Sequence, residues 1–219
     1  MTRQLNFCLE ITRPHWQLHD KLNFGLPIAL LAWSRTASDV DSGPPPDVAV
    51  LLAQALVQAH RVSFLVADEA LPITMAAAGS SSVQSIPSRG VVSALAARWH
   101  GEPTHWHWLS TCDAKVARTL FDQAGFDWTL QAQVVLLSPA DAPAPVLDLE
   151  LTQALCRGGS PELVPVLRAA GIRIVVRPGV DGAAVGLVGL ADDQAEGWLQ
   201  ELEGLCRSKG WTVAREADG

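Results

Sequence analysis

The sequence predicts an α/β fold: a mixed, mostly parallel sheet with helices on both faces and a C-terminal ββαβ extension. Three observations lead to this prediction. Apolar runs such as RVSFLVA (61–67) do not alternate with polar residues, which is typical of strands buried on both faces. Between residues 61 and 137 such strands alternate with helical segments, as in βαβ units with parallel strands. Beyond residue 171 the pattern changes to two strands, a helix and a strand.

The N-terminal elements are two strands, a helix and the strand RVSFLVA. LNFCLEI (5–11) and LPIALLAW (26–33) have strand character, and the second does not alternate, so we expect it to be fully buried. SGPPPD (42–47) interrupts regular structure. Its Asp47 is placed to cap a helix over residues 48–59.

The middle of the chain predicts a loop, two helices and a strand around the motif THWHWLST. GSSSVQSIPSRG (79–90) is rich in small and polar residues and predicts a mobile loop, followed by a short helix over 90–99. After the motif, Asp113 opens a helix with an apolar stripe, and Gly125 ends it. TLQAQVVLL (129–137) is the next predicted strand.

A proline-rich connector at 138–147 divides the chain into an α/β core (1–137) and a C-terminal ααββαβ segment (148–219). We expect the C-terminal segment to pack on the same core. Its predicted elements are two helices (147–156 and 160–171), two strands joined by the turn PGVDG (171–177 and 183–190), a helix (192–208) and a strand (211–215).

Composition excludes several classes of function. The net charge is −7 and the 16 basic residues are scattered, so no basic stripe is available to bind a nucleic-acid backbone. The four cysteines are far apart and form no CxxC motif, which favours a reducing, cytoplasmic location. Because no run of 18 apolar residues occurs, we expect no membrane span.

The motif THWHWLST contains a candidate metal site. On a strand, His105 and His107 point to the same side, together with Leu109, whereas Trp106 and Trp108 point to the other. Two such imidazoles can converge on one zinc ion, but zinc needs at least a third protein ligand and no spacing selects one. The alternative interpretation is a strand whose tryptophans pack inward and whose histidines face solvent or a partner.

The predicted ends of two strands supply the other candidate site residues. Asp68 and Glu69 follow a buried strand, and Cys112 and Asp113 follow the histidine strand. In a parallel sheet the carboxyl ends of strands meet at one edge, where ligands bind. We therefore expect any small-molecule site to be formed by these four residues, with Cys112 at a helix N-terminus that would favour its thiolate.

Two hypotheses about function follow. The first is a non-catalytic α/β interaction protein, of the adaptor or scaffold type, that binds a protein partner or itself. It rests on the absence of catalytic motifs, on a charged fraction of only 18% and on eight tryptophans. No cofactor is expected under this hypothesis. The second is a metal-assisted hydrolase or small-ligand enzyme, with zinc, centred on the histidine strand and the strand ends.

Overall fold

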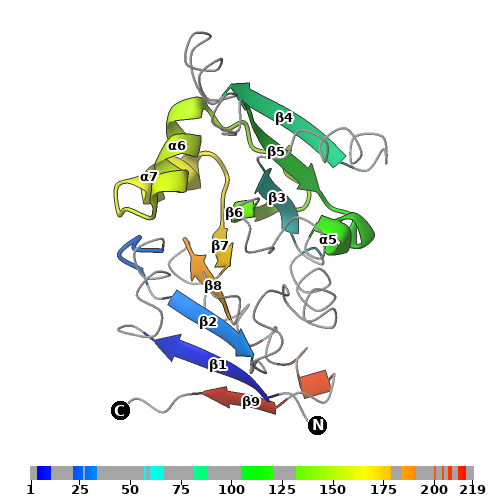
Figure 1. Ribbon diagram of the computed structural model, residues 1–219, viewed down its shortest axis with the longest axis vertical. Helices are drawn as coiled ribbons and strands as arrows, with labels where there is room; N and C mark the ends of the chain where they lie inside the picture. The colour runs from blue at the N-terminus through cyan, green and yellow to red at the C-terminus, as the bar shows by residue number, and fades with distance from the viewer. Residues whose placement is uncertain are drawn as a thin grey trace, which may run out of the picture.

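The computed structural model describes a sheet of nine strands together with parts of its helical cover (Figure 1). The strands are arranged in the order β4-β5-β3-β6-β7-β8-β2-β1-β9. The residues that the structure describes are 4–10, 22–26, 28–33, 57, 60–66, 81–87, 105–120, 132–178, 184–190, 200, 204, 207–208 and 212–215.

The strands are β1 (Gln4–Glu10), β2 (Ile28–Trp33), β3 (His60–Val66), β4 (Ser81–Pro87), β5 (His105–Thr111), β6 (Ala132–Pro139), β7 (Ile174–Pro178), β8 (Ala184–Gly189) and β9 (Thr212–Arg215). The helices of the described residues with defined bounds are α5 (Ala114–Leu120), α6 (Leu149–Arg157) and α7 (Leu163–Ala169). The eight strands expected from the sequence are confirmed. The prediction of a loop over 79–90 is wrong, because this segment contains β4.

The prediction of a mostly parallel sheet with helices on both faces is also wrong. Seven of the eight described strand pairs are antiparallel, and only β1 and β9 run parallel. The reason lies at β3, which is inserted between β5 and β6 and is antiparallel to both. The unit β5-α5-β6 therefore has the expected parallel directions, but its two strands are not neighbours.

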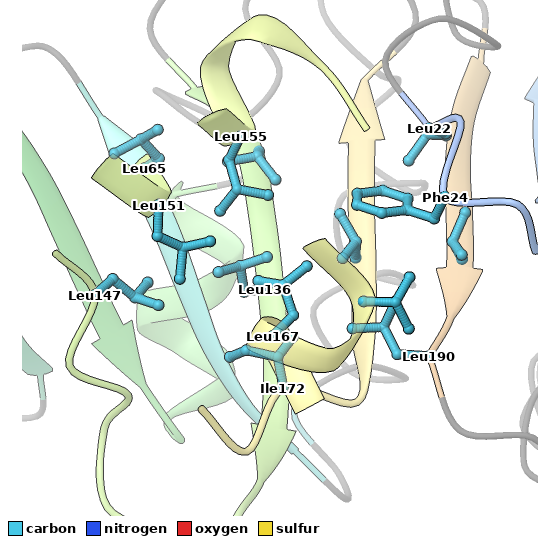
Figure 2. Close-up of a cluster of buried hydrophobic side chains, with 14 of the residues drawn as sticks. Leu22, Phe24, Leu65, Leu136, Leu147, Leu151, Leu155, Leu167, Ile172 and Leu190 are labelled. Atoms are coloured by element: carbon cyan, nitrogen blue, oxygen red, sulfur yellow. The ribbon is translucent and has the colours of Figure 1, made fainter. Parts of the chain in front are cut away.

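The helices α6 and α7 cover one face of the middle of this sheet. Asp148 caps α6, since its Oδ1 accepts a hydrogen bond of 2.8 Å from the backbone N–H of Leu151. Figure 2 shows Leu151 and Leu155 of α6 beside Leu136 of β6. These residues belong to one core cluster, which also includes residues of β3, β4, β5, β7 and β8. The helix predicted over 147–156 therefore corresponds to α6, whose buried residues are Leu151, Thr152 and Leu155.

The segment 22–26 closes the same core at the turn between α6 and α7. Leu22 and Phe24 are 0% and 2% exposed, and Figure 2 shows them beside β7 and β8. Gly159 makes this close approach possible: a Cβ atom there would lie 2.7 Å from the backbone nitrogen of Asn23. Gly25 adopts φ +69°, a conformation that favours glycine. Residues 22–25 carry no strand or helix pattern in the sequence.

Both faces of the central strands are buried, as the apolar runs of the sequence predict. In β3 the residues from Val62 to Val66 are all buried, and in β6 those from Val134 to Ser138 are. The predicted helices over 48–59 and 90–99 lie almost entirely outside the described residues, with Val57 the one exception, which is helical. Of the predicted helix 192–208, the four described residues (200, 204, 207 and 208) are helical.

Candidate functional site

The histidine pair lies on β5, next to the outer strand β4. Its ring centroids are 6.2 Å apart and the ring planes are inclined by 27°, so the rings are roughly stacked. His105 is exposed, whereas His107 is buried, with its Nδ1 2.9 Å from the hydroxyl of Ser85 on β4. The alternation expected from the sequence is therefore correct, because both imidazoles lie on the side of β5 opposite to Trp108.

A third metal ligand is not found within the described part of the chain. There, no three His, Cys, Asp or Glu side chains gather in a way that could hold an ion. The hydroxyl of Ser85 can fix the orientation and the tautomer of His107, which is the role that outer hydrogen bonds play around metal-binding histidines. The zinc site at His105 and His107 stays a prediction.

Of the four predicted strand-end residues, Cys112 and Asp113 lie among the described residues. Asp68 and Glu69 lie outside the described residues, but they follow β3, whose last residue, Val66, is opposite His107. Cys112 and Asp113 follow Thr111, which is opposite Val62 near the start of β3. Since neighbouring antiparallel strands end at opposite edges, the sheet does not bring the carboxyl ends of β3 and β5 together.

Asp113 has a structural role at the start of α5. Its Oδ1 accepts hydrogen bonds from the backbone N–H groups of Lys115 at 2.7 Å and Val116 at 3.2 Å, as an N-cap does. The hydroxyl of Thr111 accepts from the backbone N–H of Asp113 at 3.0 Å. Cys112 is exposed, with its thiol 3.6 Å from the carbonyl of Ala140. These contacts account for the strand-to-helix turn.

Buried polar groups on the α6 side of the sheet were not anticipated. The indole N–H of Trp108 donates to the hydroxyl of Thr152 at 3.0 Å, so the histidine strand is tied to α6. The hydroxyls of Ser63 and Ser110 are 2.7 Å apart. The alternation of THWHWLS places Trp108 and Ser110 inward, but the partner on α6 cannot be found without the fold.

Arg177 of β7 is the only charged residue among the fully buried described ones. Its Nη2 donates to the carbonyl of Leu155 in the last turn of α6, where a cation is favourable to the helix dipole. Burial lowers the pKa of Arg177 to about 10, so the guanidinium remains charged at neutral pH. Burial also raises the pKa of the neighbouring Cys156 thiol to about 11, against the smaller opposing effects of Arg177 and Arg157. This thiol is therefore a poor nucleophile.

The outer strand β4 has the features of a binding edge. Among the described strands it pairs only with β5, and its sequence SSVQSIP contains no charged residue. The amide of Gln84 holds the backbone of Leu147 at two points, donating to its carbonyl at 2.7 Å and accepting from its N–H at 3.2 Å. The preceding residue, Val146, is 85% exposed, the most exposed large apolar side chain described.

Comparison with protein-family models, curated proteins and solved structures finds no match to this chain. In the part of the chain that the structure describes, no helix has the length and apolar character needed to span a membrane.

Proposed function

We propose that this protein is a non-catalytic interaction protein, of the adaptor or scaffold type, that binds another polypeptide at the β4 edge of its sheet. The observation that carries the proposal is an outer strand of seven residues without any charge. Exposed edge strands present backbone N–H and C=O groups that pair with further strands. Natural proteins usually protect such edges with charged side chains or proline; β4 has no charge, and its one proline, Pro87, is its last residue.

The surroundings of β4 support the same proposal. Strand addition obtains its affinity from main-chain hydrogen bonds and its specificity from side-chain contacts on alternate residues. Gln84 fixes the connector before α6 against β4, and this places the exposed Val146 beside the strand. An added strand would find there an apolar side chain that is otherwise in water. The low charged fraction of the whole chain, 18%, is also typical of a protein with a covered surface.

Size-exclusion chromatography of a non-denaturing lysate, prepared from the cells in which the protein naturally occurs, tests this proposal. We expect the 219-residue chain, produced in those cells, to elute above its monomer mass of 23.4 kDa, and its Ser82→Lys variant to elute as a smaller species. Ser82 is exposed on β4, so a lysine there adds charge to the edge without filling buried space. Elution of the wild-type protein as a monomer, both in the lysate and after purification, would contradict the proposal. Thermal unfolding of both proteins shows that the variant is folded.

A further inference from the structure

We infer that the polypeptide bound at β4 is a second copy of this chain, paired β4 to β4 in antiparallel orientation about a two-fold axis. The inference rests on the proposed function and names its partner. It would join the two nine-stranded sheets into one continuous sheet. Such an interface is isologous, because each copy contributes the same residues.

The composition of β4 suits pairing with itself. A two-fold axis through the strand places its central residue opposite the same residue of the second copy, so a charge at that position would face a like charge, which is destabilising. β4 contains only serine, valine, glutamine, isoleucine and proline. A partner of different sequence could tolerate or even require charge in β4, but a self-pairing strand is best without it.

Pro87 fixes which backbone groups of β4 face outward. Proline has no N–H to donate, so in an edge strand its nitrogen faces away from the neighbouring strand. Because alternate residues face the same edge, the N–H and C=O groups of Val83 and Ser85 face outward as well. An antiparallel pair with Val83 opposite Ser85 of the second copy then exchanges hydrogen bonds at both positions.

In this register Gln84 is opposite Gln84 of the second copy, on the two-fold axis, and this brings Val146 into the interface. The axis is perpendicular to the sheet, so both α6 helices lie on the same side. Gln84 binds the backbone of Leu147 on that side, so Val146 and its symmetry mate lie close to the axis. The side chain that is 85% exposed in the single chain is thereby covered in the pair.

The small size of this edge predicts a reversible dimer. A stable interface of standard size buries about 800 Å² on each partner, more than one seven-residue strand and one valine provide. We therefore expect a dissociation constant of the order of micromolar. The dimer should be populated at the concentrations of a purified sample and should dissociate on dilution.

Sedimentation analysis of the purified 219-residue chain, over about 1 to 200 μM, tests the inference. We expect the mass to rise from 23.4 kDa towards twice that value. Ser82→Lys and Val146→Lys should each weaken self-association at least about 10-fold, a change of 1.4 kcal/mol or more. The matched control is Val166→Lys, which changes another exposed valine (48% exposed) on α7. This helix is held towards β8 by the hydrogen bond from Arg168 to the carbonyl of Leu190, so Val166→Lys should leave the dimer unchanged.

Amide hydrogen exchange locates the interface independently of the variants. The N–H groups of Val83 and Ser85 should exchange more slowly at high protein concentration than at low concentration. A dimer that resists both β4-side variants, or that Val166→Lys weakens equally, would overturn the inference while leaving the proposed function in place. If the purified protein is a monomer at every concentration from about 1 to 200 μM but is part of a larger species in the lysate, β4 binds a different partner and not a second copy. A monomer in both would overturn the inference and the proposed function together.

Discussion

Replacing Gly159 with alanine should destabilise the protein by about 1–3 kcal/mol, the usual range for extra volume in a close-packed interior. The added Cβ would lie 2.7 Å from the nitrogen of Asn23 and 2.9 Å from the carbonyl carbon of Leu22. Both are backbone atoms, so no side-chain rotation relieves the contact, and the segment 22–26 has to move. This displaces Phe24, which is 2% exposed. Complete loss of the Phe24 contacts, about 3–5 kcal/mol as for Phe→Ala, is the upper limit.

Urea unfolding followed by tryptophan fluorescence measures this free energy from the midpoint and the slope. The control is Gly204→Ala, at a helical, exposed position where a Cβ would meet nothing within 4 Å. Alanine favours a helix over glycine by about 0.5–1 kcal/mol, so this variant should be as stable as the wild type or more so. Equal stability of the two variants would refute the close approach of residues 22–24 to the turn between α6 and α7.

Three further predictions follow from individual contacts. In the native protein, iodoacetamide should modify the exposed Cys112 long before the half-buried Cys156, because burial raises the pKa of the Cys156 thiol to about 11 and the thiolate is the reactive form. Equal modification rates of the two cysteines at pH 8, measured by peptide mapping with mass spectrometry, would contradict this. Thr152→Val should cost about 1–3 kcal/mol in urea unfolding because it leaves the buried indole N–H of Trp108 without its acceptor, whereas Thr152→Ser should retain most of the stability. The predicted zinc site is tested by measuring the metal content of protein purified without a chelator or a histidine tag. Near-stoichiometric zinc that is lost in the His105→Ala variant would support the site. Folded protein without metal would contradict it.

Residue patterns predicted local structure well wherever one periodicity dominated. The alternation in THWHWLST correctly placed the histidines and tryptophans on opposite sides of β5, because side chains on a strand alternate strictly. No alternation marks β4 in the sequence, because three of its seven residues are serines and its apolar residues Val83 and Ile86 lie on opposite faces. It is also flanked by residues typical of loops. Such a strand is specified by its neighbour β5 more than by its own composition.

Strand direction and long-range contacts could not be read from the sequence. The alternation of strands and helices over residues 61–137 fixed β5 and β6 as parallel, but it contained no signal that β3 would lie between them. Because β3 and β5 are antiparallel neighbours, their carboxyl ends lie at opposite edges of the sheet. The candidate site built from Asp68, Glu69, Cys112 and Asp113 stays a prediction, since Asp68 and Glu69 lie outside the described residues. The buried positions of Leu22 and Phe24 likewise depend on Gly159, more than a hundred residues away in the chain.

The strand order also dictates when each half of the sheet can form during synthesis on the ribosome. The strands β3 to β6 are contiguous in sequence, so their pairings are complete once residue 139 has emerged. The pair of β1 and β2 is synthesised before the other strands. The outer edge of β2 stays unpaired until β8 has been synthesised, and that of β1 until β9 has been synthesised. Pairings of such long sequence separation are slow to form and leave strands open to misassociation. We therefore expect the first 33 residues to depend most on chaperones while the chain is being made.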